Sequence, residues 1–212
     1  TYPNLANPGG TFNGSAVTYT ALGSISGLQA SRADITSLIK PIIDGGAGGV
    51  YNFTVTETTE GQDGEALVVV YSNALLGIST VGILDGFSAQ LGDSTAINFA
   101  TALHPGTAGF EAEMSLGIGY SCCTQASTIK VNGTTITTVA GNNDDGVGSL
   151  TNGQLITVGG YDDPFSTLLP SYENDHERYN LLPYIADGDT TITIDTLNPS
   201  SDDNIFLAVI KV

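Results

Sequence analysis

The chain has 212 residues, which is enough for one domain with a sizeable core, and we expect a single module over residues 1–212. It carries 22 Asp and Glu against 5 Lys and Arg, so its formal net charge is −17. A surface this negative repels phosphates and anionic headgroups, which excludes nucleic acid and acidic membranes as partners. Apolar residues make up 41% of the chain, so it is not a disordered acidic tail. No apolar run approaches the roughly 20 residues that span a bilayer, and we expect no membrane insertion.

The first predicted element is a short helix near residues 32–40. Ser31 is placed to cap it, with Asp34 three residues later in the spacing of a capping box. Ile35, Leu38 and Ile39 then form an apolar stripe, and Pro41 limits the length of the helix.

Strands are predicted along most of the remaining chain. Apolar and polar residues alternate clearly from Phe110 to Ile118, and residues 66–71 are continuously apolar, which suits a strand buried on both faces. Asn132-Gly133 favours a tight hairpin turn between 129–131 and 134–139. The fold class is therefore all-β, an antiparallel β-sandwich with long acidic loops and one short helix. The other strands are expected at 50–55, 80–84, 95–99, 155–158, 191–195 and 205–212.

Acidic residues are concentrated in segment 141–204, which holds 12 of the 22 acids and a single basic residue, Arg178. They occur in short clusters with Asn and Gly, as expected of loops. Carboxylate, amide and backbone oxygens are the ligands that Ca²⁺ prefers, and adjacent carboxylates repel one another unless a cation lies between them. We therefore expect bound Ca²⁺, although such clusters are also common in solvated turns. The predicted metal ligands are Asn142, Asp144, Asp145, Asp162, Asp163, Asn174, Asp175, Asp187, Asp189, Asp202, Asp203 and Asn204.

Catalytic motifs are missing from the sequence. It contains no H-E-x-x-H, G-x-S-x-G, P-loop or G-x-G-x-x-G pattern, and only two histidines. Glu111 and Glu113 share one strand face and could flank a glycosidic bond, but nothing around them suggests the apolar setting that a catalytic acid needs. The sequence predicts a protein that is not an enzyme.

Cys122 and Cys123 are adjacent, so they cannot join distant segments. Two outcomes remain open for them, a strained vicinal disulfide or two buried thiols. Tyrosines gather near the acids, and Tyr161 and Tyr172 are expected to be exposed, where tyrosine supplies contact area for recognition at low entropic cost.

Several segments together resemble one family of modules. The carrying segments are Asp63-Gly64-Glu65-Ala66-Leu67-Val68-Val69-Val70-Tyr71, Ser79-Thr80-Val81-Gly82-Ile83-Leu84-Asp85-Gly86, Arg178-Tyr179-Asn180-Leu181-Leu182-Pro183, Asp187-Gly188-Asp189-Thr190 and Asn198-Pro199-Ser200-Ser201-Asp202-Asp203-Asn204-Ile205-Phe206. They resemble the calcium-dependent peptide-binding module of large bacterial RTX adhesins, and similar sequences occur in other anchored bacterial surface proteins. The resemblance covers residues 49–212, and Cys122-Cys123 departs from it.

The resemblance implies a secreted, extracellular β-sandwich that holds short protein ligands with Ca²⁺ at or near the groove. We expect a monomeric adhesion module, of the kind that acts in biofilms, whose partner is a short peptide or a protein on a host or neighbouring cell. Two alternatives stay open, a calcium-dependent carbohydrate-binding module and a structural spacer.

The predicted ligand site consists of Tyr161, Asp162, Asp163 and Tyr172 beside Asp144, Asp145 and Asp175. The clusters at Asp187–Asp189 and at 202–204 are assigned to structural ions or plain turns, because both adjoin predicted strands.

Overall fold

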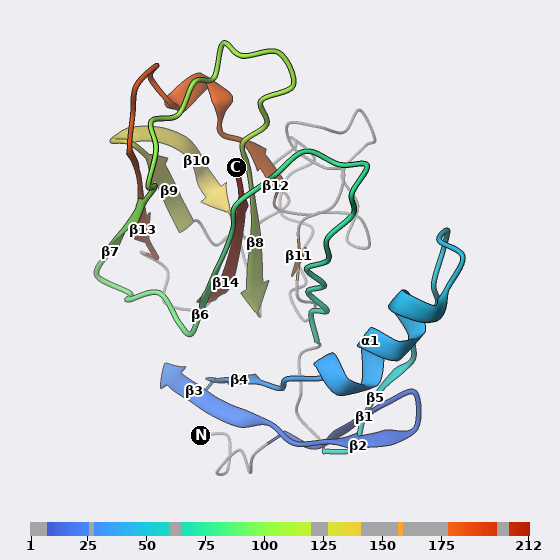
Figure 1. The fold of residues 1–212 in the computed structure, drawn as a ribbon. Coiled ribbons are helices and arrows are strands. Elements are labelled where there is room, and N and C mark those ends of the chain that lie inside the picture. Colours follow the sequence, from blue (N-terminus) through green and yellow to red (C-terminus); the bar gives the residue numbers. More distant parts are fainter. Residues whose placement is uncertain are drawn as a thin grey trace. The chain divides into compact units, whose positions relative to one another are not determined.

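A computed structural model of the chain describes residues 8–25, 28–59, 65–119, 127–140, 157–158, 178–198 and 204–212. The chain divides into two compact units, Thr1–Glu65 and Ala66–Val212 (Figure 1). All strand pairs in the described residues are antiparallel, and these residues contain one α-helix, so the predicted all-β class is confirmed. No helix in the described ranges has the length and apolar character of a membrane span. That the two units act as one module stays a prediction.

The first unit contains two small sheets that the sequence analysis did not predict. One has the order β2-β1-β5, and the other is the hairpin β3-β4. The turn between β1 and β2 consists of Asn13 and Gly14, which both adopt the positive φ that such a tight turn requires. The strands are β1 (Gly10–Phe12), β2 (Ser15–Val17), β3 (Thr20–Ile25), β4 (Leu28–Arg32) and β5 (Val55–Glu57).

Helix α1 (Thr36–Gly45) begins later than predicted. Ser31 lies in β4 opposite Ala21, five positions before the first residue of the helix, so it does not cap α1. Asp34 instead accepts a hydrogen bond from the amide of Thr36 at 2.9 Å. Pro41 lies inside the helix and does not end it. Proline removes one backbone hydrogen bond, and the burial of Ile39 offsets part of the free energy lost with that bond.

The second unit is built from two antiparallel sheets. One has the order β10-β9-β13-β7, and the other has the order β11-β8-β14-β6, with β12 also paired to β8. A short 3₁₀ helix, η1 (Leu182–Tyr184), follows β12. The strands are β6 (Val81–Asp85), β7 (Asp93–Asn98), β8 (Glu113–Gly119), β9 (Ser127–Val131), β10 (Thr134–Ala140), β11 (Thr157–Val158), β12 (Arg178–Asn180), β13 (Thr191–Leu197) and β14 (Asn204–Lys211).

The hydrophobic core of the second unit is formed by side chains from both of its sheets. Alternate residues of β8 point into this core because successive side chains of a strand face opposite ways. Side chains of β9, β13 and β14 join the same buried cluster, which gives the unit the sandwich-like packing that was predicted. The central members are Met114, Leu116, Ile118, Ile129, Val131, Ile192, Ile194, Ile205, Ala208 and Ile210.

Two strand predictions were wrong. Residues 66–71 form no strand, and their side chains are half-buried or exposed. The strand expected at 50–55 is replaced by β5, because the first unit pairs Val55–Glu57 with β1 in a sheet that alternation alone did not reveal. The hairpin at Asn132-Gly133 is confirmed, with both residues at positive φ.

Leu116→Ala should destabilise the protein strongly, because the Leu116 side chain is 1% exposed in the shared core. We expect a loss of about 2–5 kcal/mol in the free energy of unfolding, measured by urea denaturation. Leu75, which is 92% exposed, provides the matched control. Leu75→Ala should change the free energy by less than about 0.5 kcal/mol. Equal losses in the two variants would contradict the assignment of the core.

Candidate functional site

The two sheets of the second unit terminate together at one end of the sandwich. In one sheet, β8 ends at Gly119 opposite the first residue of β14. In the other, β13 ends at Leu197, opposite Thr128 of β9. Ser88 joins these ends, because its amide donates to the carbonyl oxygen of Ile205 at 2.9 Å and its hydroxyl contacts that of Thr196 at 2.7 Å. We call this the Ser88 end.

Three segments of the chain start and finish at the Ser88 end. Residues 120–126 connect β8 to β9, and residues 199–203 lie between β13 and β14. Residues 141–156 follow Ala140, which lies opposite Ser127, and precede Thr157, which lies opposite Ile118. The described strands therefore fix the starts and ends of these three segments at one end of the sandwich. The segments contain the cysteine pair and two of the predicted acidic clusters. Their residues, which lie outside the described ranges, are Cys122, Cys123, Asn142, Asp144, Asp145, Asp202 and Asp203. Asn204 opens β14, and only its backbone is described.

The other part of the predicted site belongs to segment 159–177, which is anchored along the edge of β8. Val158 lies opposite Gly117, and Arg178 lies opposite Ser115, so both anchors of the segment are close together on one strand. Segments 141–156 and 159–177 are separated only by the two residues of β11. The predicted residues Tyr161, Asp162, Asp163, Tyr172, Asn174 and Asp175 lie outside the described ranges.

Asp187 and Asp189 lie at the opposite end of β13 from segment 199–203. The Asp189 carboxylate accepts a hydrogen bond from the Ala186 amide at 2.8 Å, and Gly188 has a φ of +91°. Asp187 contacts Nδ1 of His104 at 2.8 Å. These contacts have the geometry of a hydrogen-bonded turn. No group of three or more His, Cys, Asp or Glu side chains within the described residues could hold a metal ion, so Ca²⁺ binding by Asp187 and Asp189 stays a prediction.

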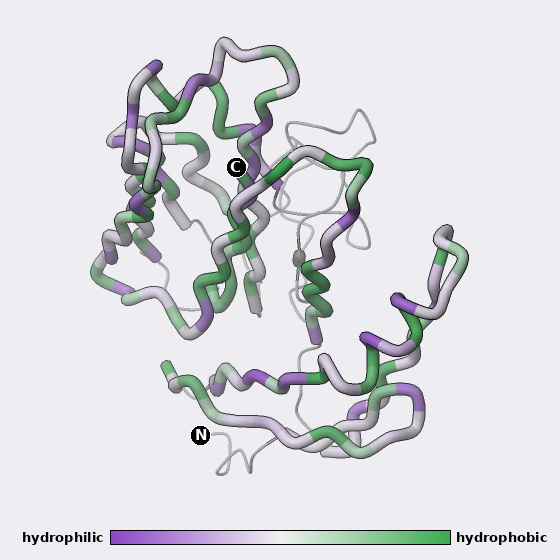
Figure 2. Tube along the Cα trace, viewed as in Figure 1, coloured by the Kyte–Doolittle hydropathy of each residue, from purple (hydrophilic) through white to green (hydrophobic). Residues whose placement is uncertain are grey.

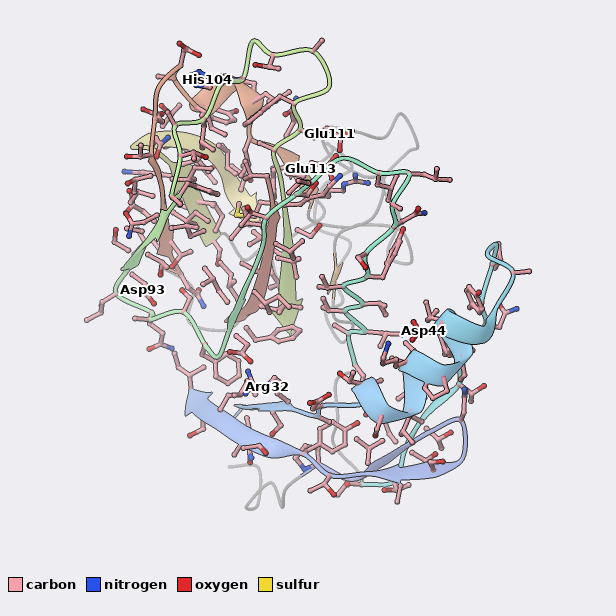
Figure 3. All side chains as sticks on the ribbon, in the orientation of Figure 1. Arg32, Asp44, Asp93, His104, Glu111 and Glu113 are labelled. Atoms are coloured by element: carbon pink, nitrogen blue, oxygen red, sulfur yellow. The ribbon has the colours of Figure 1, made fainter. Side chains whose placement is uncertain are left out.

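Glu111 lies just before β8, and Glu113 is the first residue of that strand (Figure 3). Each of the two forms an ion pair. Lys211 of β14 contacts Glu111 at 2.5 Å, and Arg178 of β12 contacts Glu113 at 2.6 Å. The hydrogen bond from Lys211 and its positive charge hold the pKa of Glu111 below the usual value. A catalytic acid needs a raised pKa, so this arrangement does not favour acid catalysis by Glu111.

The other three cations also lie beside described acids. Lys40 pairs with Asp44 one helical turn away. Lys130 lies opposite Asp195 on the neighbouring strand. Asp34 has a lowered pKa, first because of its hydrogen bonds with Thr36 and to a smaller extent because of the positive charge of Arg32. Every Lys and Arg of the chain thus lies near a described carboxylate.

Segment 141–177 has no such internal compensation. It contains seven acids and neither Lys nor Arg. Its acids are Asp144, Asp145, Asp162, Asp163, Glu173, Asp175 and Glu177.

Tyr19 and Glu65 form a separate polar contact in the first unit, which the sequence analysis missed because they are 46 positions apart. The Tyr19 hydroxyl donates to the Glu65 carboxylate at 2.5 Å. Burial, then the hydrogen bond and the negative charge of Glu65, raise the pKa of Tyr19 well above its ordinary value.

Comparisons of the chain with protein-family models, with curated proteins and with solved structures find no match.

Tyr19 should ionise later than an ordinary phenol when the pH is raised. In a phenolate absorbance titration, the difference between the native chain and Tyr19→Phe should develop well above pH 10, the ordinary pKa. The stability that comes from this raised pKa is fully present below about pH 10 and is lost above it, because the unfolded state gives up the proton first. Glu65→Gln, which removes the carboxylate charge, should bring the late ionisation to lower pH. A difference centred near pH 10 would contradict the contact.

Proposed function

We propose that the chain is a calcium-dependent adhesion module of a large secreted bacterial surface protein and that it binds a short peptide or protein terminus. The observation that carries this proposal is the distribution of charge. All five Lys and Arg lie beside acids of the described elements, whereas segment 141–177 has seven acids and no Lys or Arg.

Mutual repulsion among these carboxylates would be relieved by a bound cation. Without one, adjacent carboxylates raise one another's pKa and oppose a compact loop arrangement. Ca²⁺ suits such loops better than Mg²⁺, because it accepts six to eight oxygen ligands in flexible geometry, whereas Mg²⁺ requires a tight octahedron. The chemistry of these loops therefore supports Ca²⁺ as the counter-ion.

The anchoring strands support a joint site for the two acidic segments. Asp144 and Asp145 precede β11, and Asp162 and Asp163 follow it, while β11 itself is fixed to the edge of β8. The acids of both segments therefore flank one short strand in the sequence, and this is the basis for proposing a joint site. Asp175 comes three positions before Arg178, whose backbone is paired to the same edge.

A peptide terminus fits this arrangement for an electrostatic reason. A ligand carboxylate would be repelled by a chain of net charge −17 unless a partly coordinated Ca²⁺ reversed the sign of the local field. Tyr161 and Tyr172, at the rim, would supply the contact area. The sequence resemblance to the peptide-binding module of RTX adhesins points the same way, and it places the chain outside the cell as part of a surface protein.

Removing Ca²⁺ should destabilise the protein. Ca²⁺ at a hundredfold excess over its Kd adds about 2.7 kcal/mol to the native state. For a chain of this length that corresponds to a rise in Tm of about 5–10 °C. Thermal melting in EDTA, in millimolar Ca²⁺ and in millimolar Mg²⁺ checks this, and Mg²⁺ should restore less stability than Ca²⁺. An identical Tm in all three would overturn the calcium proposal.

The ligand site can be separated from structural effects by paired variants. Asp162→Ala with Asp163→Ala should abolish binding to peptides selected from a display library in Ca²⁺, and should lower Tm only modestly. Asp187→Ala with Asp189→Ala is the matched control, because it removes the same charge from a turn before β13 that is not part of segment 159–177, and it should leave binding intact. Hits on a glycan array alone would instead favour a carbohydrate-binding module. No hits in either the peptide library or the glycan array would favour a spacer.

A further inference from the structure

An apolar segment of the second unit is left exposed. Residues 66–71, Ala-Leu-Val-Val-Val-Tyr, have no regular secondary structure, and the side chains of Val70 and Tyr71 are 58% and 63% exposed. Figure 2 colours this run as hydrophobic, directly after the grey trace that precedes it. Leu75, Leu76 and Ile78 are exposed as well. Exposed apolar runs of this kind are typical of surfaces that pack against another segment or partner.

Strand β6 offers an open edge nearby in the sequence. Among the described strands it pairs only with β14. Thr80 and Val212 exchange both backbone hydrogen bonds, at 2.6 and 2.9 Å, and the amide of Gly86 donates to the carbonyl oxygen of Phe206. Because hydrogen-bonded pairs alternate in an antiparallel ladder, the amides of Gly82 and Leu84 face β14, and those of Val81 and Ile83 face away from it.

Both faces of β6 are apolar at this edge. Leu84 packs against the core of the sandwich, and Val81 and Ile83 are 37% and 46% exposed on the other face. A strand added beside β6 would therefore need apolar side chains in both directions. Residues 66–71 meet that requirement, since every one of their side chains is apolar or aromatic.

The connection between the two segments already turns. The backbone amide of Leu76 donates to the carbonyl oxygen of Asn73 at 3.0 Å, and the amide of Leu75 donates to the Asn73 side chain at 2.9 Å. Asparagine at the first position of such a turn is a common way to fix a reversal. Residues 72–80 thus join the apolar run to β6 by a connection that contains a formed turn, and the entropic cost of closing a loop grows only slowly with its length.

We propose that residues 66–71 form a strap that docks as an added antiparallel strand along the outer edge of β6. Docking extends the sheet β11-β8-β14-β6 by one strand, gives the outward amides of Val81 and Ile83 hydrogen-bond partners, and buries the apolar run. The occupant is the strap of the same chain and not that of a second copy. The covalent link supplies a high effective concentration, and two chains of net charge −17 repel each other.

Residue-resolved amide hydrogen exchange, measured by NMR on the full chain, tests the strap. With the strap docked, Val81 and Ile83 should exchange at least about tenfold more slowly than free-chain rates, as an opening equilibrium predicts. Gly82 and Leu84 are internal controls, because β14 protects them in either arrangement. Exchange of Val81 and Ile83 at free-chain rates in the native chain would overturn the proposal.

A matched pair of proline variants assigns the protection to the strap. Val69→Pro removes a donor from the strap and should abolish protection at Val81 and Ile83 while Gly82 and Leu84 stay protected. Ala74→Pro places proline at the second position of the Asn73 turn, where it is favoured, and should leave all four amides unchanged. Protection that survives Val69→Pro, or that grows with protein concentration in the native chain, would contradict docking of the chain's own strap.

Discussion

Repulsion among carboxylates is the constraint on which the organisation of this chain depends. With 22 acids and 5 Lys and Arg, the carboxylates outnumber these basic side chains more than fourfold. Three of the basic side chains form ion pairs within or between elements of secondary structure or next to them. Arg178 and Lys211 join β12 and β14 to the start of β8, and Lys40 stabilises α1. The pairs of Lys40 and Lys211 are exposed and contribute little individually, so the fold depends mainly on its apolar core.

That core explains why the acids can be tolerated at all. Strands β8, β9, β13 and β14 bury alternate aliphatic side chains between two sheets, and no charged side chain belongs to this cluster of described residues. The burial of apolar area supplies the stability, and every acid in the described ranges is half-buried or exposed, where water reaches its carboxylate. The separation also means that changes in the loop acids can alter ion binding without disturbing the packing of Leu116 or Ile192.

The sequence predicted the parts of the fold in which local pattern and tertiary packing agree. Asn132-Gly133 and the alternation that leads to Ile118 were identified because turn chemistry and the faces of the strands act locally. Strands β1–β4 and β12 were missed, because they are short, or rich in small and polar residues, and their pairing partners decide their structure. Residues 66–71 show the converse, since a run of strong strand propensity has no regular secondary structure in the described fold. The ion pair of Glu111 with Lys211 joins positions 100 apart, which no spacing rule reveals. The acidic segments could be identified by composition, but their anchoring at β11 and Ser88 required the strand register.

Polar side chains in the turns at the two ends of the sandwich differ in the hydrogen-bond partners that the chain offers them. Away from the Ser88 end, the chain satisfies its own turns. The side chain of Asn132 donates to the carbonyl oxygen of Tyr184 and accepts from the amide of Thr193, both at 2.9 Å, and Asp189 closes its turn onto Ala186. A carboxylate used in this way has a hydrogen-bond donor within the chain. The acids before and after β11 greatly outnumber the basic residues near them in the sequence, and carboxylates accept hydrogen bonds but cannot donate them to one another. A cation that bridges several oxygens is the simplest group that meets that need. The proposed Ca²⁺ therefore has its strongest chemical support in the composition of the loops around β11.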